Sequence, residues 1–394
     1  MEQTRLIIQL LDESAFESMD KEWNLLLEAS LANSPFLTWE WMWTWWEVYG
    51  SPYKLCLLEV LNEQGVRVGL APFKIASRHY KGFPYRQVEF IGYGGPEKAC
   101  PDYLDIIIAP GFEEQVVQAV WDYFLNHKDT FDIFRFTDIP STSKTLLLLK
   151  NQAKESGYLA EREEGTRCPY VPIRGRWEDY FKSLTLNHRS NLRQSEKNLQ
   201  KLYGLTFNIV CTRPDLDRAM AALFVLHKNV WNARGETGSF DHHPFNRQFH
   251  IHLMERMSLS GGVVIYELKV HGELAAVLYA YSYHNRVFYY QIGRDTKLFK
   301  YSVGRVLIGT ILQSLFKEAA WTDGEFDFLR GPEDYKYNWT KLEHLNKNLT
   351  IWNQTTYARL LYILIRIWQF LRPTARSLRR MLKKTLLLKK RLLR

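Results

Sequence analysis

The chain has 394 residues, which is enough for two or three domains, and 46% of them are hydrophobic, which excludes a mainly disordered protein. The formal net charge is +9, but residues 357–394 hold twelve of the 52 Lys and Arg residues and none of the 43 acids, so the first 356 residues hold 40 basic and 43 acidic ones. The body of the protein is therefore slightly acidic, and nucleic acid is not an expected partner.

The sequence shows no targeting or membrane-spanning segment. Residues 1–5 contain no basic region followed by an apolar one, so no signal peptide is evident. No uncharged apolar run approaches the ~20 residues needed to cross a bilayer. The four cysteines lie far apart without a CxxC pair, which argues against a zinc site or disulfide framework and suits a reducing compartment. We therefore expect a cytoplasmic protein.

The first half of the chain predicts one α/β unit. Alternating apolar residues around tight turns predict strands, and a longer run of helical period predicts a helix. In chain order these are strands at 55–61 and 66–73, a strand at 103–108, a helix at 113–126 and a strand at 131–136. Ahead of all of these elements, five tryptophans fall within residues 39–46. We interpret these as packing in the core and between units, with a sugar-stacking platform as the alternative.

A helix is predicted at residues 184–202, between the two halves. Arg189 and Arg193 begin a series of cations that recurs every four residues and forms one stripe. A solvated helix face explains this stripe. The functional interpretation is that the two arginines bind a phosphate or an anionic sugar, which a guanidinium does with two parallel hydrogen bonds.

The second half repeats the order of the first. Strands are predicted at 263–270, 274–283 and 287–292, a helix at 306–320 and a strand at 326–329. The same succession in both halves predicts two tandem α/β units, joined near residues 160–175. We place the boundaries at 1–165, 166–356 and, for a basic tail, 357–394.

The turn before the second-half helix is a candidate phosphate site. Tyr301, Ser302, Val303, Gly304 and Arg305 lie where a strand and a small-residue turn lead into that helix. The first N–H groups of a helix lack internal partners and its dipole attracts anions. A plain N-cap role for Ser302 is the alternative. The matching place in the first half carries Glu113 and Glu114, which would repel a phosphate, so we assign the cofactor to the second half.

Several motifs resemble the GNAT acyltransferase superfamily, and in particular its CelD-like, cellulose-biosynthesis-type acetyltransferase branch. They are YSVG at 301–304, FDFLRG at 326–331 and YKYNW at 335–339, with upstream pieces at 34–41, 187–193, 227–231, 234–240 and 272–276. The resemblance implies two GNAT-like units, each a mixed, mostly antiparallel sheet flanked by helices, with acetyl-CoA as acyl donor. It also implies that residues 301–305 bind the pyrophosphate. The branch usually has proline where this chain has Val303, so the turn is less rigid.

The resemblance implies two catalytic residues. Asp327 lies in the Phe-Asp-Phe strand, and a carboxylate there is costly to bury without a partner. We expect it to act as base or to orient the acceptor, or else to form a structural ion pair with Arg330 or Lys336. Tyr335 occupies the position from which related enzymes protonate the departing coenzyme A thiolate, with simple packing as the alternative.

Further residues are predicted to line the acceptor site. Tyr289 and Gln291 should share one face of their strand, since side chains alternate along it. The candidates for substrate binding are Arg189, Arg193, Trp231, Tyr289, Gln291, Lys336 and Trp339.

Other chemistries find little support in the sequence. No GxSxG elbow, P-loop or GxGxxG motif occurs, which fits direct transfer from an activated thioester. Four histidines between 242 and 252 lack supporting cysteines or carboxylates in a ligand pattern, so we expect no metal.

The tail carries its own pattern. In residues 357–394 leucines recur every four residues between pairs of cations, which suits the surface of an anionic bilayer. Contact with RNA and disorder are the alternatives.

Together these features predict an acyltransferase that moves an acyl group, expected to be acetyl, to an amine or hydroxyl of a saccharide or other envelope precursor. A Fem-type aminoacyl transferase, which also has tandem GNAT-like units and uses aminoacyl-tRNA, is the second hypothesis. A non-catalytic scaffold for envelope-polymer assembly is the third.

Overall fold

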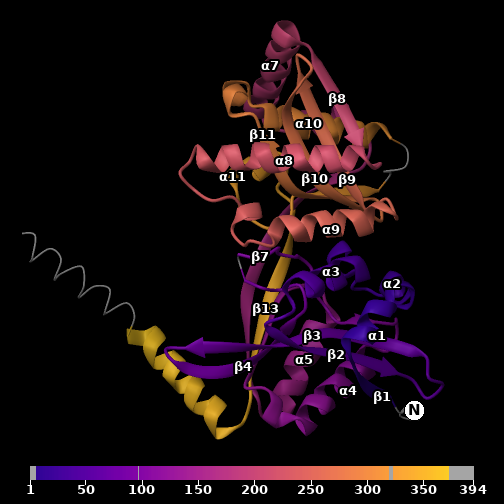
Figure 1. The fold of residues 1–394 in the computed structure, drawn as a ribbon, viewed down its shortest axis with the longest axis vertical. Helices are drawn as coiled ribbons and strands as arrows, with labels where there is room; N and C mark the ends of the chain where they lie inside the picture. The colour runs from indigo at the N-terminus through magenta and orange to yellow at the C-terminus, as the bar shows by residue number, and fades with distance from the viewer. Residues whose placement is uncertain (1–5, 96, 319–322, 372–394) are drawn as a thin grey trace, which may run out of the picture.

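The computed structural model describes residues 6–95, 97–318 and 323–371. The chain forms two α/β halves stacked end to end, as Figure 1 shows. The first contains β1 (Ile7–Leu11), α1 (Glu13–Ser18), α2 (Asp20–Ala29), η1 (Pro35–Leu37), α3 (Trp39–Tyr49), β2 (Tyr53–Leu61), β3 (Arg67–Tyr80), β4 (Phe83–Phe90), β5 (Ile107–Ile108), α4 (Glu113–Asn126), η2 (Lys128–Thr130), β6 (Ile133–Pro140) and α5 (Lys144–Glu155).

The second half begins in β7 (Leu159–Ile173), a strand that both halves share. It continues with α6 (Trp177–Ser183), α7 (Leu186–Tyr203), β8 (Leu205–Val210), α8 (Asp215–Asn232), η3 (Ser239–Asp241), α9 (Asn246–Ser258), β9 (Val263–Val270), β10 (Glu273–Tyr283), β11 (Arg286–Arg294), η4 (Thr296–Tyr301), α10 (Val303–Lys317), β12 (Gly324–Asp327), α11 (Asp334–Tyr337) and β13 (Glu343–Trp352). Residues 356–371 are also helical.

Each half contains the same strand–helix–strand crossover. In the first, β4 pairs with β6 in parallel, and α4 connects them. In the second, β11 pairs with β12 in parallel, and α10 connects them. Every other strand pair is antiparallel. The predicted fold class, two tandem units with mixed sheets flanked by helices, is therefore confirmed.

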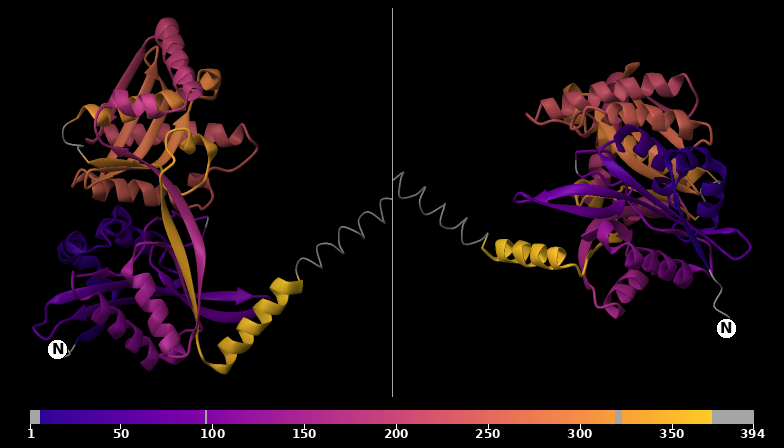
Figure 2. Two further views of the ribbon diagram at one scale, coloured as in Figure 1. Left: turned by 180° about the vertical axis from the view of Figure 1, so that it is seen from behind. Right: turned by 60° about the horizontal axis from the view of Figure 1, so that its bottom comes forward.

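The two sheets join through an exchanged strand. The strand order runs β1-β2-β3-β4-β6-β13-β7-β12-β11-β10-β9-β8. β13, from the end of the second half, lies between β6 and β7 and completes the first sheet. β7 pairs with β13 along Leu159–Pro169 and with β12 along Tyr170–Ile173. Both strands run side by side between the halves in Figure 2.

The predicted strand at 103–108 is mostly wrong. Only Ile107 and Ile108 form a strand there, and they pair with β3 at Gly69 and Leu70. β3 also pairs with β4, a strand that was not predicted. Tyr103 has φ +57°, a left-handed conformation that breaks an extended run.

The side chains of β10 alternate between the two faces of the second sheet, and each face packs into a different hydrophobic core. Val277, Tyr279 and Tyr281 belong to the core that spans both halves. Ala276, Leu278 and Ala280 belong to the core under α10. The tryptophans of α3 join the first of these, with Trp41 packed edge-on against rings of the second half. Their interpretation as packing between units is confirmed.

Candidate functional site

A cavity of about 590 Å³ lies at the N-terminal end of α10. Its walls come from α7, the end of α8, β11, η4, α10 and the α11 segment. The lining residues are His188, Trp231, Arg234, Tyr289, Ile292, Arg294, Phe299, Ser302, Val303, Gly304, Arg305, Ile308, Glu333, Tyr335, Asn338 and Trp339. The cavity therefore brings together most of the predicted pyrophosphate turn, Tyr335, and three of the predicted substrate-binding residues.

The first turn of α10 leaves backbone donors open to this cavity. Ser302, the N-cap, is left-handed (φ 53°, ψ 43°) and its hydroxyl makes no capping bond. Its carbonyl accepts the N–H groups of Arg305 (2.8 Å) and Val306 (3.2 Å). Val303 and Gly304 are the first two residues of α10, so the helix itself offers no acceptor to their N–H groups. Two donors and the positive end of the helix dipole thus point where an anion can bind.

Three arginines add charge around these donors. Arg234, Arg294 and Arg305 line the cavity, and Glu333 is the one acid among its described lining residues. Arg294 lies against the helix start, because a Cβ on Gly304 would sit 2.7 Å from the Arg294 Cδ. Gly304 therefore makes room for a guanidinium as well as for close approach of a ligand. Helix dipole and arginines together suit a diphosphate.

Strands β11 and β12 separate where the cavity opens. Their parallel pairing ends at Phe288 and Asp327. Beyond it, the hydroxyls of Tyr289 and Tyr335 lie 3.4 Å apart across the gap. Burial raises the pKa of Tyr335 to about 12. Its hydroxyl therefore keeps its proton at neutral pH and can act as a hydrogen-bond and proton donor to a leaving group.

A bulge in β11 changes which side chains face the cavity. Tyr279 pairs with Gln291 and Ala280 with Tyr289, so Tyr290 has no partner on β10. Tyr289 faces the cavity, whereas the Gln291 amide donates to Ser239 Oγ (3.0 Å), outside the cavity lining. The prediction that Tyr289 and Gln291 share a face is therefore wrong, since the extra residue shifts the alternation.

His188 lines the cavity and belongs to the motif at 187–193, but it is not among the predicted substrate-binding residues. It is 4% exposed, and its Nε2 is buried with no hydrogen-bond partner in the described part of the chain. Burial, with help from the Arg305 charge, lowers the pKa of His188 to about 4. The imidazole is therefore neutral at pH 7 and offers an unpaired nitrogen to a substrate.

Two tryptophans form apolar walls of the cavity. The Trp339 ring lies edge-on to His188, with centroids 4.4 Å apart. Trp231 Nε1 donates to His227 Nε2 (3.0 Å), which fixes the indole, and the Arg234 guanidinium lies 5.2 Å from its ring centroid. These contacts hold both rings in place beside the arginines.

Other predicted binding residues lie outside this lining. Tyr301 precedes the turn but does not line the cavity. Arg193 is exposed, with its guanidinium 4.9 Å from the Phe181 ring centroid, and Arg189 is half-buried on the same helix. The buried Lys336 ammonium donates to the carbonyls of Leu329 and Arg330 and pairs with Glu333 at 2.9 Å. Lys336 thus stabilises the loop that carries Tyr335.

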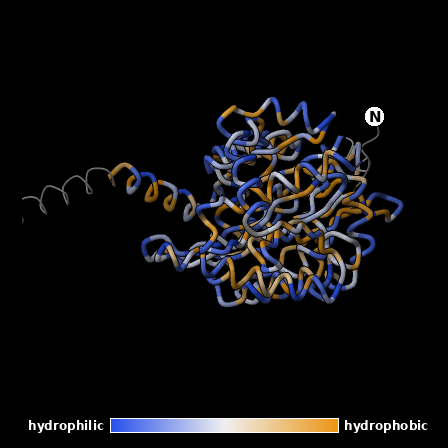
Figure 3. The backbone as a smooth tube through the Cα atoms, turned by 90° about the horizontal axis from the view of Figure 1, so that it is seen from above, coloured by the Kyte–Doolittle hydropathy of each residue, from blue (hydrophilic) through white to orange (hydrophobic). Residues whose placement is uncertain are grey.

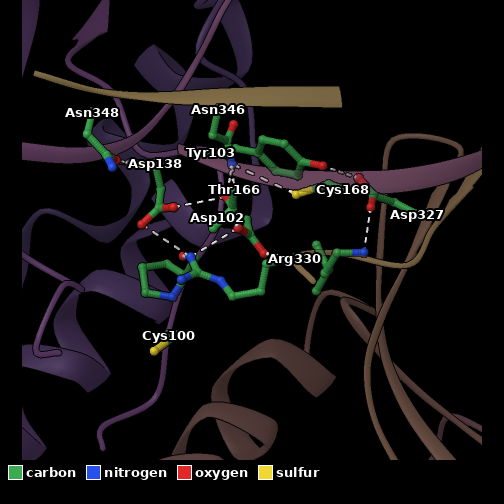
Figure 4. A network of polar contacts seen from close by, with 12 residues as sticks. Cys100, Asp102, Tyr103, Asp138, Thr166, Cys168, Asp327, Arg330, Asn346 and Asn348 are labelled. Atoms are coloured by element: carbon green, nitrogen blue, oxygen red, sulfur yellow. Dashed lines mark hydrogen bonds and ion pairs between the residues drawn. The ribbon is translucent and has the colours of Figure 1, made fainter. Parts of the chain in front are cut away.

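Asp327 belongs to a polar network between the two halves, shown in Figure 4. It is fully buried, and its carboxylate accepts the Tyr103 hydroxyl (2.6 Å) and the Leu329 N–H (2.7 Å). Burial raises the pKa of Asp327 to about 7. Because side chains alternate along β12, Asp327 faces the first half and not the cavity, and the structure does not bring it together with Tyr335.

Arg330 lies in the same network but has other partners. Its guanidinium pairs with Asp102 (3.0 Å) and Asp138 (3.3 Å). The expected ion pair of Asp327 with Arg330 or Lys336 is therefore wrong. The hydrogen bonds of the buried Asp327 carboxyl come instead from the Tyr103 hydroxyl and the Leu329 N–H.

A second cavity, of about 350 Å³, lies between the halves and is lined in part by Tyr103, Asp105, Arg286 and His344. Beside it, Glu325, Asp327 and His344 place three ligand-type atoms within 4.8 Å of one another. The Glu325 and His344 side chains already meet at 2.8 Å. The absence of a metal stays a prediction.

Known proteins resemble this chain in fold and in one domain. Residues 187–337 match the family model described as "Acetyltransferase (GNAT) domain". No curated protein matches. Among solved structures, FemX is similar over 91% of this chain and 99% of its own, with 10% identity and a TM-score of 0.60.

Two further structures are similar over nearly their whole length. A conserved protein of unknown function from Bacteroides thetaiotaomicron covers 88% of this chain and 100% of its own, at 9% identity and a TM-score of 0.52. A C-terminal domain provisionally assigned to a lysylphosphatidylglycerol synthetase from Agrobacterium fabrum covers 89% and 96%, at 11% identity and a TM-score of 0.50. At these identities the likeness shows the fold alone. The chain has the fold of these structures, and residues 187–337 in its second half resemble the GNAT acetyltransferase domain.

Proposed function

We propose that this chain is an acyltransferase that takes an acyl group, in the first instance acetyl, from coenzyme A. The observation that carries the proposal is the start of α10, where the N–H groups of Val303 and Gly304 face a cavity lined by three arginines. The GNAT domain match at residues 187–337 includes this turn and supports the same chemistry.

The residues have distinct roles in direct transfer. The turn 302–305 and the arginines bind the diphosphate and fix the thioester. The amine or hydroxyl of the acceptor attacks the thioester carbonyl, and the carbon–sulfur bond breaks. Tyr335 protonates the departing sulfur and is reprotonated from solvent, and the proton that the acceptor loses passes to solvent, so that the acceptor's proton is balanced by the one gained by the thiol. The neutral His188 accepts a hydrogen bond from the acceptor and so orients it. Asp327 has no place in this scheme, because it does not reach the cavity.

The acceptor belongs to the finer part of the proposal. The motif resemblance to the CelD-like branch favours a hydroxyl or amine of a saccharide or other envelope precursor. Trp231 and Trp339 support it, because indole rings suit the apolar faces of sugars. Release of thiol from acetyl-CoA, measured over a panel of sugar nucleotides and amines, tests this choice. Silence over the whole panel with a folded protein would favour the scaffold hypothesis.

Calorimetry with acetyl-CoA tests the donor. In Arg305→Glu, affinity should fall at least ~tenfold, because a charge-assisted donor is replaced by a repelling acid. Arg193→Glu, an exposed reversal on α7 outside the cavity, is the matched control and should bind like the parent. Equal losses in both variants, or no binding by the parent, would contradict the proposal.

The likeness to FemX favours a second candidate function, aminoacyl transfer from aminoacyl-tRNA. Its donor also carries phosphates, so the α10 turn does not by itself separate the two candidates. Binding of tRNA that weakens steeply with salt, without binding of acetyl-CoA, would select the aminoacyl transferase. Tight binding of acetyl-CoA would select our first proposal.

A further inference from the structure

Helix 356–371 is apolar on two sides, and the body covers only one of them. Its inner side, including Ala358, Leu361 and Ile365, is buried or half-buried. Leu361 and Ile365 form a small core with Ile133 and Trp352. This contact fixes the helix against the first sheet and determines which of its sides faces outward.

The outer side presents an apolar stripe. Its residues are Leu360 (60% exposed), Ile363 (50%), Ile367 (50%), Phe370 (82%) and Leu371 (47%). At about 100° per residue they fall within roughly one quarter to one third of the helix circumference. Arg359 and Arg366 lie along one edge of this stripe by the same spacing. Figure 3 shows the helix extending away from the body, with hydrophobic residues along it.

The hairpin β3–β4 lies beside this helix, as Figure 1 shows. The Lys81 ammonium lies 4.5 Å from the centroid of the Trp368 ring, and the Tyr357 hydroxyl donates to the Pro84 carbonyl. Next to the turn, Phe83 is 48% exposed. The hairpin thus adds another exposed aromatic residue and a cation next to the stripe.

Charge decides which partner fits this surface. Residues 357–394 contain twelve Lys and Arg residues and no acid. Two copies of such a segment would repel each other, which opposes pairing of stripes from two chains. An apolar stripe edged by cations matches a surface with an apolar interior and anionic headgroups.

We propose that the stripe of helix 356–371, together with the tip of the β3–β4 hairpin, docks this protein on an anionic lipid bilayer. The helix lies in the plane of the interface, since its 16 residues span only ~24 Å against a hydrocarbon core of ~30 Å. In the described ranges, no helix is long and apolar enough to cross the bilayer. This inference does not depend on the reaction that the cavity performs.

Co-sedimentation of the full chain with vesicles tests the proposal. Vesicles of equal parts phosphatidylcholine and phosphatidylglycerol should bind the protein, and vesicles of phosphatidylcholine alone should bind it much more weakly. The triple variant Leu360→Ser, Ile363→Ser, Ile367→Ser should lose at least ~tenfold in partitioning, because three apolar side chains no longer enter the interface.

The matched control removes three exposed leucines elsewhere. Leu25, Leu147 and Leu259 are 67%, 59% and 91% exposed on other elements, and their joint change to Ser should leave vesicle binding unchanged. Both triple variants should keep the parent's thermal unfolding midpoint, because all six side chains are exposed. Acetyl-CoA binding should be equal in all three proteins.

Three results would overturn the proposal. In the first, the triple variant of the stripe (called the stripe variant below) sediments with anionic vesicles as strongly as the parent does. Another is a concentration-dependent dimer of the parent that the stripe variant loses, which would assign the stripe to a second copy. The third is salt-sensitive binding of RNA, lost in the stripe variant, by a protein that ignores the vesicles.

Discussion

The two crossover helices, α4 and α10, occupy equivalent places in their units but begin differently. In α4 the first turn carries Glu113 and Glu114, and the Glu113 carboxylate accepts the Gly111 N–H (3.0 Å) and pairs with Lys144 (3.2 Å). In α10 the first turn has no acid and no side-chain cap, and it lines a cavity with arginines. The N-terminus of α4 is thus capped by a carboxylate of the chain itself, whereas the N-terminus of α10 is the one we propose for the diphosphate.

This difference shows how one topology serves two purposes. A helix N-terminus is attractive to anions in any fold, so a unit that binds no anion must supply its own negative charge. Hydrogen bonding by backbone N–H groups, first of all its own, lowers the pKa of Glu113, which is the signature of a carboxylate held as a cap. We therefore expect no diphosphate site in the first unit.

We expect the largest effect on stability from a substitution in the aromatic contact between the two units. Phe36 is fully buried, and its ring packs edge-on against Trp41, Tyr281 and Phe288, the last two from the second unit. Phe36→Ala should lower the free energy of unfolding by ~3–5 kcal/mol, as for other buried aromatic residues. Urea denaturation measures this loss. A loss below ~1 kcal/mol would mean that the units do not depend on this packing.

Tyr335→Phe tests the proposed proton donation in the cavity at the N-terminus of α10. The turnover number should fall ~100-fold or more, because a general acid is removed, while calorimetric affinity for acetyl-CoA stays within about twofold. A parallel loss of affinity would assign Tyr335 to binding, and unchanged turnover would refute its role as proton donor. Tyr337→Phe, on the same short helix but outside the cavity, is the control.

Asp327 makes the joint between the units sensitive to pH. Its folded-state pKa of about 7 lies above the ordinary value of 3.8, so the folded state holds a proton that the unfolded state has lost. Its contribution to stability is complete below pH ~4 and is lost as pH rises through ~7, on the order of 4 kcal/mol for a pKa raised from 3.8 to about 7. Urea unfolding from pH 4 to 8 should therefore show a steeper decline for the parent than for Asp327→Asn. Parallel profiles would contradict this.

We expect the smallest effect on stability from a substitution of Glu113, the acid at the N-terminus of α4. Glu113→Gln should lower the free energy of unfolding by ~0.5–1 kcal/mol, because the α4 start loses its anion. Acetyl-CoA affinity should not change. If calorimetry detected a second acetyl-CoA site in the variant, Glu113 alone would be what prevents the first unit from binding acetyl-CoA.

Much of the fold could be predicted, because it is encoded in local patterns. Alternation of apolar residues placed the strand at 263–270 correctly. The helix predicted at 306–320 is present as α10, but it begins three residues earlier, at Val303, within the predicted turn. The repeated order of elements in each half predicted the tandem units. These features need only short-range information.

The rest depends on contacts that no local pattern carries. The bulge at Tyr290, which turns Gln291 away from the cavity, follows from pairing with β10. The burial of Asp327 against Tyr103 joins residues 224 positions apart. His188, Arg234 and Arg294 come from separate elements, so the sequence offered no reason to group them. His188 could have been found as the one histidine in the motif at 187–193.

The exchanged strand β13 also governs how the protein can be made. Until residues 343–352 have emerged from the ribosome, the first sheet lacks the strand between β6 and β7, and both edges are open to other chains. Maturation of the N-terminal sheet must therefore wait for synthesis of nearly the whole polypeptide, and shortened products ending before β13 would be prone to aggregate.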